Sequence, residues 1–209
     1  MLLCIDIGNT NIVLGLHDGE KWSARWRVRT ARDNMPDEYE VLIRSLFSQR
    51  GLSIDAVERV VISSVVPRLK GVFREMFEDD LGITAIVLGP GAKTGVKIRT
   101  DNPVEVGADL IADAAAAHEL YGGPAVVVDF GTATTFSAIS AAGEFLGVAI
   151  APGVDVAAEA LTRNTAQLPQ VGLTAPEKAI GTNTVHALQS GLIFGYVGLV
   201  EGLVARIRA

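Results

Sequence analysis

Two stretches, LLCIDIGNTN at residues 2–11 and VVVDFGTATT at residues 126–135, follow one pattern that decides the fold. Each begins with an apolar run typical of a strand, ends that run in Asp-x-Gly, and continues with small polar residues. A second strand is expected after each turn, followed by a hairpin signal at residues 18–20 or 142–144 and then by a third strand. The repetition predicts two duplicated lobes, each with the order strand, turn, strand, hairpin, strand, helix.

Alternating strands and helices complete the first predicted lobe. A helix is expected at residues 36–49, and a strand at residues 60–64 follows it. A helix after Pro67 and a strand at residues 85–88 come next. This alternation predicts an α/β protein in which helices pack on a mixed sheet.

A helix is expected to connect the two lobes. Residues 102–105 read Asn-Pro-Val-Glu, which places an Asn at the N-cap, a proline at the first helical position and a Glu three residues after the cap. We expect this helix to reach about Leu120, with Asp109 in its second turn. It would contain Gly107, which costs about 1 kcal/mol relative to alanine inside a helix and so suggests that another group approaches closely. The lobes are predicted to span residues 1–113 and 114–209.

The second lobe shows fewer elements than the first. Helices are expected at residues 154–162 and 184–208, but the sequence offers no counterpart of the strand–helix–strand segment at residues 60–88. We therefore expect a second lobe that is either truncated or naturally reduced.

The composition is typical of a soluble α/β protein that acts on small molecules. Hydrophobic residues make up 49% of the chain, aromatic residues 6%, and the net charge is −6 without a long basic run, so no nucleic-acid partner is expected. The single cysteine, Cys4, excludes an intramolecular disulfide and fits the reducing cytoplasm. We find no apolar stretch of the roughly 18 residues that a bilayer span needs, and so expect no membrane partner.

The Asp-x-Gly turns have the residues of a phosphate cradle. Such a cradle needs backbone N–H groups, small residues that let the backbone approach, and hydroxyl or amide side chains, all of which residues 8–11 supply. Asp6, at the end of the strand, could hold Mg²⁺ through water. One such turn alone is most simply an ordinary hairpin. The second copy at residues 129–135 favours phosphate binding, because two equivalent turns can grip a nucleotide from both sides.

Asp109 is the candidate for catalysis. A carboxylate near the γ-phosphate of ATP could accept the proton of an attacking hydroxyl group. The alternative is a surface aspartate that shares one helix face with Asp113. Spacing alone does not separate these readings.

Seven motifs in order identify a family resemblance. They occupy residues 6–11, 101–103, 105–109, 129–135, 150–153, 168–169 and 180–184. With them the chain resembles the type III pantothenate kinases, members of the superfamily of sugar kinases and actin, over essentially all of its length. The resemblance implies two duplicated actin-like (ribonuclease H-like) lobes with mixed sheets flanked by helices, and a nucleotide in the cleft between them. It also implies ATP-dependent phosphorylation of pantothenate, the first step of coenzyme A synthesis, by a cytoplasmic homodimer that uses Mg²⁺ and a monovalent cation, K⁺ or NH₄⁺.

The resemblance also implies a role for individual residues. Asp109 matches the catalytic base, Asp129 the ligand of the monovalent cation, Thr132 a contact to ATP in the second turn, and Thr184 a pantothenate contact made by the dimer partner. The first ATP-binding turn is matched by Asp6, Ile7, Gly8, Asn9, Thr10, Asn11, Ile12 and Val13. The further positions that match the pantothenate pocket are Thr100, Gly107, Ala108 and Leu110.

Departures from the family pattern cluster at the substrate positions. The family has an arginine where this chain has Leu110 and a tyrosine where it has Thr100. Arginine offers a charged, planar fork to a carboxylate such as that of pantothenate, whereas leucine offers neither charge nor donors. Two alternatives therefore stand beside the kinase reading: a nucleotide-binding or regulatory relative without full activity, and a kinase for a less anionic hydroxyl substrate.

Overall fold

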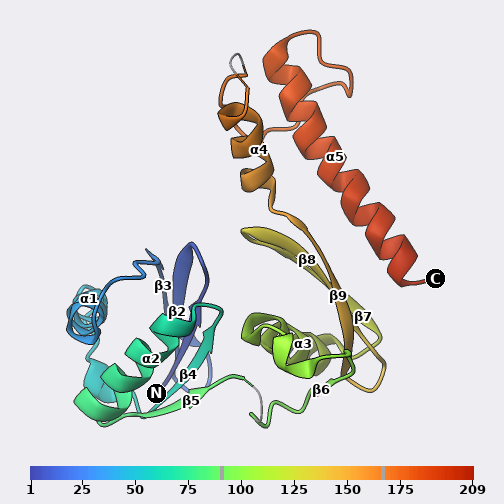
Figure 1. Cartoon of the computed structure of the whole chain (residues 1–209). Helices are drawn as coiled ribbons and strands as arrows, with labels where there is room; N and C mark the ends of the chain where they lie inside the picture. The colour runs from blue at the N-terminus through green and yellow to red at the C-terminus, as the bar shows by residue number, and fades with distance from the viewer. Residues whose placement is uncertain (90–91, 166–167) are drawn as a thin grey trace. The chain divides into compact units, whose positions relative to one another are not determined.

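The computed structural model describes residues 1–89, 92–165 and 168–209. The chain folds into two compact units, Met1–Gly95 with Asp101–Ala115, and Val96–Thr100 with Ala116–Ala209. Helix α3 (Ala108–Tyr121), which is labelled in Figure 1, contributes residues to both units, and the short segment 96–100 belongs to the second. The predicted lobe boundary at residues 113/114 falls within this same helix and stays a prediction.

A mixed five-stranded sheet with the order β3-β2-β1-β4-β5 forms the centre of the first unit. Strand β1 pairs antiparallel with β2 and parallel with β4, and β2 continues antiparallel into β3. The duplicated pattern thus forms a three-stranded meander, to which β4 and β5 add in parallel. The strands are β1 (Leu2–Ile7), β2 (Asn11–His17), β3 (Trp22–Arg29), β4 (Arg59–Ser64) and β5 (Thr84–Val87).

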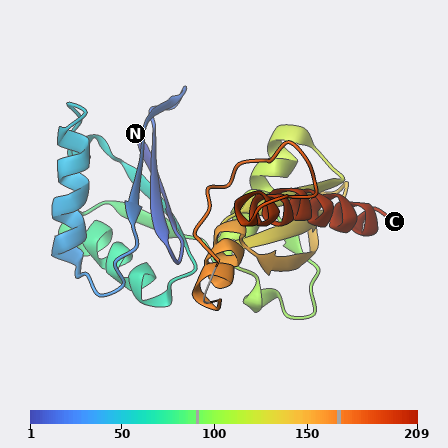
Figure 2. The same cartoon turned by 90° about the horizontal axis from the view of Figure 1, so that it is seen from above.

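Alternation along the strands separates a buried face of this sheet from the face that carries Asp6. On β1 the side chains of Leu3, Ile5 and Ile7 are buried, whereas Asp6 is exposed on the opposite face. The buried face joins one core with helices α1 and α2, which lie on the same side of the sheet (Figure 2). The helical elements are α1 (Pro36–Ser48), η1 (Ile54–Ala56), α2 (Pro67–Glu75) and the π-helical turn η2 (Met76–Asp80).

Aromatic pairs fix the helices on the core. Trp26 of β3 stacks on Phe47 of α1 with ring centroids 4.9 Å apart, and Tyr39 of α1 meets Phe73 of α2 at 4.6 Å. Both phenylalanine rings and the tyrosine ring are almost completely buried, so each pair adds about 0.5–1.5 kcal/mol to the burial of its apolar area.

The second unit repeats the meander in a four-stranded sheet with the order β6-β9-β8-β7. Strand β6 is parallel to β9 and the other pairs are antiparallel, which confirms mixed sheets in both units. A bulge between β8 and β9 leaves Leu146 without a partner, and the next residue, Gly147, has a φ of 153° that favours glycine. The elements are β6 (Lys97–Ile98), β7 (Ala125–Phe130), β8 (Ala133–Ile139), β9 (Glu144–Pro152), α4 (Val154–Arg163) and α5 (Thr184–Ile207).

The expected continuous helix from Pro103 to Leu120 was wrong at its start. Pro103–Glu105 form a separate 3₁₀ turn, η3, and Val106 is extended with a ψ of 124°. The Asn102 side chain makes no capping bond; its amide instead donates to the Glu105 carboxylate at 2.6 Å. Helix α3 therefore begins at Ala108, so that Gly107 precedes the helix and Asp109 lies in its first turn.

Helix α5 also departs from expectation. Its 24 residues have a mean hydropathy of 1.5, so by length and composition it could cross a membrane, contrary to our reading of the sequence. A single such helix is by itself weak evidence for a membrane span. Polar side chains tie α5 to its own unit: Tyr196 donates to the carbonyl of Pro152 at 2.8 Å, and Gln189 to that of Gly172 at 3.0 Å.

Candidate active site

The first Asp-x-Gly turn is closed and held in place by hydrogen bonds to its backbone carbonyl oxygens. The N–H of Gly8 donates to the carbonyl of Asn11 at 3.0 Å, and a Cβ at Gly8 would lie only 3.1 Å from that oxygen. Thr30, just after β3, donates through its hydroxyl to the carbonyl of Gly8 at 2.7 Å and through its N–H to the carbonyl of Thr10 at 2.9 Å. Because the carbonyl oxygens of Gly8, Thr10 and Asn11 all accept hydrogen bonds, they repel a nearby anion less.

Other predicted residues of this turn differ in what they can offer a ligand. Ile7 and Ile12 are fully buried in the core, so only their backbone can contact a nucleotide. Val13 and Asp6 are directly opposite each other in the antiparallel pair and share the outer face of the sheet. Asp6 is exposed there, at the carboxyl end of β1.

Ser63 is a candidate that sequence reasoning missed. It pairs with Asp6 in the parallel β1–β4 ladder and therefore lies on the same face of the sheet. Its side chain is 6% exposed, and its hydroxyl has no hydrogen-bond partner within the described residues. A buried hydroxyl without a partner is costly unless something else completes its hydrogen bonding. The signal in the sequence was the pair of serines that ends an otherwise apolar strand.

Asp109 is connected to the first turn through Val65. The N–H of Val65, directly after β4, donates to the carbonyl of Ile7 at 3.1 Å. A Cβ at Gly107 would lie 3.7 Å from Cγ1 of Val65, so the start of α3 lies beside the same end of the sheet. Asp109 and the first turn thus belong to one unit and lie at the same end of the sheet, beside the carboxyl ends of strands β1 and β4.

Gly107 makes room for the carboxylate of Asp109. A Cβ at position 107 would overlap Oδ1 of Asp109, and that same oxygen accepts from the N–H of Leu110 at 2.8 Å. The close approach that the sequence suggested at Gly107 is therefore made by the Asp109 side chain itself.

Leu110 is a packing residue. It is 9% exposed, and Ala108, two residues before it, is also buried. Ile111 and Ala114 complete the buried face of the first part of α3. A guanidinium at this position would have to leave that apolar environment. Thr100 belongs to the other unit, where its hydroxyl is buried and has no partner among the described residues.

The second Asp-x-Gly turn packs tightly against the start of α4. The N–H of Gly131 donates to the carbonyl of Ala133, and the N–H of Gly153 to the carbonyl of Thr132, both at 2.9 Å. A Cβ at Gly153 would overlap the backbone of the turn, so only glycine allows this approach. The N-terminus of α4, which carries a partial positive charge, thus lies beside Thr132.

Asp129 and Thr184 are the remaining predicted residues of the second unit. Asp129 is exposed near the end of β7 and is paired in register with Thr135, whose hydroxyl is buried without a partner among the described residues. Thr184 begins α5 and is exposed; the preceding Asn183 caps the helix by accepting from the N–H of His186 at 2.9 Å. The roles of these residues stay predictions.

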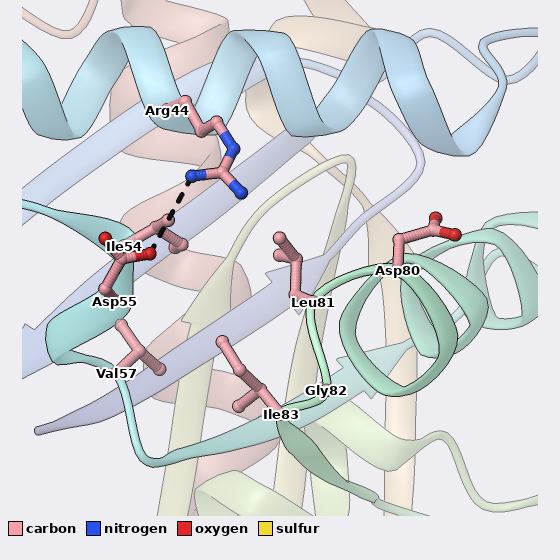
Figure 3. Close-up of a pocket in the computed structure, with 8 residues that line it drawn as sticks. All are labelled: Arg44, Ile54, Asp55, Val57, Asp80, Leu81, Gly82 and Ile83. Carbon is pink, nitrogen blue, oxygen red and sulfur yellow. Dashed lines mark ion pairs between the residues drawn. The ribbon is translucent and has the colours of Figure 1, made fainter.

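A pocket of about 370 Å³ in the first unit contains none of the predicted residues (Figure 3). Arg44 of α1, which is 3.9 Å from Asp55, and the apolar side chains of Leu81 and Ile83 contribute to its wall. Asp80 from this wall also forms a cluster of carboxylates with Asp37 and Glu40, whose oxygens lie within 4.8 Å of one another. Exposed acidic groups are common without a metal, so the cluster is no evidence of a metal site, and the pocket wall includes neither the first turn nor Asp109.

Comparison with known sequences places the chain in one family. A family model described as type III pantothenate kinase matches residues 2–206. The chain is 51% identical over 209 residues to a type III pantothenate kinase of Moorella thermoacetica and 48% identical over 209 residues to one of Myxococcus xanthus. Each alignment covers 100% of this chain and 82% of the relative.

Solved structures support the fold. A putative Baf family transcriptional activator from Campylobacter jejuni has a TM-score of 0.60 at 21% identity, covering 96% of this chain and 78% of its own. A putative 2-dehydro-3-deoxygalactonokinase from Sinorhizobium meliloti also has a TM-score of 0.60, at 12% identity, covering 98% of this chain and 81% of its own. At these identities the likeness concerns the fold alone.

Proposed function

The chain belongs to the type III pantothenate kinase family, and on that premise we propose that it transfers the γ-phosphoryl group of ATP to pantothenate in the first step of coenzyme A synthesis. The observation within the structure that supports this most is the junction at Val65. There the first turn, braced by Thr30, and the start of α3, which carries Asp109, lie at the same end of one sheet.

The transfer needs a proton acceptor and a phosphate grip. Asp109 accepts the proton of the pantothenate hydroxyl group as the oxygen of that hydroxyl attacks the γ-phosphorus. ADP leaves on the opposite side of the phosphorus. In the first unit, the turn at residues 8–11 is the proposed contact to the phosphates. In the second unit, Thr132 lies beside the N-terminus of α4 and is the proposed ATP contact there, since helix N-termini favour anions.

We also propose two cation sites, each built from oxygen donors of the described residues. Asp6 and the unpartnered hydroxyl of Ser63 share a face, a donor set suited to water-mediated binding of Mg²⁺. Asp129 and the unpartnered hydroxyl of Thr135 offer oxygens of the kind that K⁺ or NH₄⁺ requires. When bound, Mg²⁺ neutralises phosphate charge that develops during transfer.

A second copy of the chain is the proposed cover for α5. Only 11% of its apolar span is buried, and Phe194 and Val197 are 39% and 49% exposed. We propose that this homodimer is cytoplasmic and that Thr184 of one copy contacts pantothenate bound to the other, as the family resemblance implies. Sedimentation of the wild type as a dimer, and of Phe194→Glu as a monomer, supports this; a monomeric wild type contradicts it.

The activity is tested with purified protein, ATP, Mg²⁺, K⁺ and pantothenate, with detection of 4′-phosphopantothenate by mass. Asp109→Asn should lower kcat by a factor of about 10² to 10⁴, the usual contribution of a general base. Asp79→Asn, which changes an exposed aspartate on η2 in the same way, should leave kcat unchanged. No product from the wild type, or equal rates for the two variants, would contradict the proposal.

A nucleotide-binding relative without this activity is the second candidate. The burial of Leu110 favours it, because the charged partner that family members offer at this position is replaced by a packed apolar side chain. Calorimetry that detects ATP but no pantothenate binding would select this candidate.

A further inference from the structure

The loop after β3 is held rigidly against the first turn. Thr30 donates twice to carbonyls of the turn, at 2.7 and 2.9 Å. The next residue, Ala31, exchanges two bonds with the hydroxyl of Tyr39: its N–H donates at 3.2 Å and its carbonyl accepts at 2.7 Å. Tyr39 is itself 1% exposed in the core, so the backbone that leads into Arg32 is fixed from both sides.

Arg32 reaches back from this loop to the turn. Its guanidinium donates to Oδ1 of Asn9 at 2.9 Å, across 23 positions of sequence. Because arginine has only donors, the atom of Asn9 that faces it must be the amide oxygen. The NH₂ group of Asn9, which has two donors, is therefore directed elsewhere, an orientation suited to an anion in the turn.

The described residues provide no ion pair for the positive charge of Arg32. The adjacent Asp33 is 3.0 Å from Arg68. Asp33 is thus already engaged, and Arg32 remains exposed with most of its five N–H donors available. The turn itself, residues 8–11, contains no lysine or arginine. A cation of this kind, on a fixed backbone, is what a phosphate group binds most strongly.

We propose that Arg32 binds the terminal phosphates of ATP at the first turn, with Asn9 holding its guanidinium in place. This inference rests on the proposed ATP-dependent function and deepens it, since it adds a charged residue from outside the Asp-x-Gly motif. The side chain acts in binding. Its loss is expected to weaken the binding of a nucleotide more when that nucleotide carries β- and γ-phosphates.

Calorimetric titration of the whole chain with Mg²⁺-ATP and with AMP, in the absence of pantothenate, tests the proposal. Arg32→Gln should weaken ATP binding by about tenfold or more, the usual effect of losing a charge-assisted hydrogen bond. AMP, which lacks the β- and γ-phosphates, should bind within about twofold of wild type. The matched control is Arg25→Gln, an exposed arginine on β3 that pairs with Gly15, away from the turn.

ATP binding by Arg32→Gln as tight as by Arg25→Gln would overturn the inference. So would an equal loss of ATP and AMP affinity, because a general disturbance of the turn affects both nucleotides. The outcome is separable from the kinase assay. A wild type that binds ATP but forms no 4′-phosphopantothenate would contradict the proposed function while the nucleotide comparison still decides on Arg32; a wild type that binds no ATP would overturn both.

Discussion

Replacing Gly107 by alanine should separate activity from stability. The added Cβ would overlap Oδ1 of Asp109, whereas its next neighbours, Cγ of Asp109 and Cγ1 of Val65, would be 3.5 and 3.7 Å away in ordinary contact. Gly107 is not among the glycines with a positive φ, so alanine can adopt its backbone conformation. The main structural response is therefore a rotation of the Asp109 carboxylate.

The magnitudes follow from what this rotation changes. Moving Oδ1 breaks its bond from the N–H of Leu110, now 2.8 Å, which is worth about 0.5–1.5 kcal/mol of stability. A catalytic group displaced by about 1 Å, by contrast, can cost about 10²-fold in rate. We expect Gly107→Ala to lower kcat by about 10²-fold, with a small fall in the unfolding midpoint and an unchanged KM for ATP.

A coupled-enzyme assay of ADP release gives kcat and KM for each variant, and thermal unfolding gives its stability. Gly71→Ala is the control, since a Cβ there would meet nothing within 4 Å and alanine favours the interior of α2. If Gly107 acts through Asp109, adding Gly107→Ala to Asp109→Asn should cost no further activity. A wild-type kcat for Gly107→Ala, or additive losses in the double variant, would refute the reasoning.

Three further substitutions probe the turns and one surface ion pair. Thr30→Val removes the hydroxyl bond to the first turn and should cost about 0.5–1.5 kcal/mol in urea unfolding, together with a higher KM for ATP; an unchanged KM would mean that the brace does not shape the phosphate site. Gly153→Ala should cost about 1–3 kcal/mol, since its Cβ overlaps the backbone of the second turn, and full stability would contradict the packing at α4. The Arg99 guanidinium, which donates to the Glu144 carboxylate through Nε at 3.0 Å and also through Nη2, lowers the pKa of that carboxyl from its ordinary value of 4.5. The stabilisation relative to Arg99→Leu should therefore be full above pH 4.5 and vanish as the pH falls through the lowered pKa; a pH-independent difference in unfolding midpoint would count against it.

Local patterns predicted most of the secondary structure. The Asp-x-Gly repeat led to both meanders, and helices expected at residues 36–49 and 154–162 were found at Pro36–Ser48 and Val154–Arg163. These elements depend on hydrogen bonds and side-chain periodicity within a few residues, which a sequence displays directly. The helix start at Asn102 failed, because its Glu105 bonds the Asn side chain and Val106 turns to an extended conformation.

The solvent exposure of the residues of α5 also could not be predicted from local sequence patterns. The sequence of this helix is apolar enough for a core or a bilayer, and whether its residues are covered depends on what packs against them. Nothing in the order of its residues distinguishes a face that a neighbouring element buries from one that stays open. The same holds for Leu110, whose burial only the folded α3 reveals.

The sequence by itself determined the two Asp-x-Gly turns, the order of strands and helices, and the resemblance that pointed to the family. Only the tertiary structure decided which side chains surround those turns. Ser63 and Arg32 lie far from residues 6–11 in the chain, and they come to the turn through a parallel strand pair and through a loop braced by Thr30 and Tyr39. Such neighbours are set by long-range pairing and packing, so their proximity to the turn is absent from any local pattern.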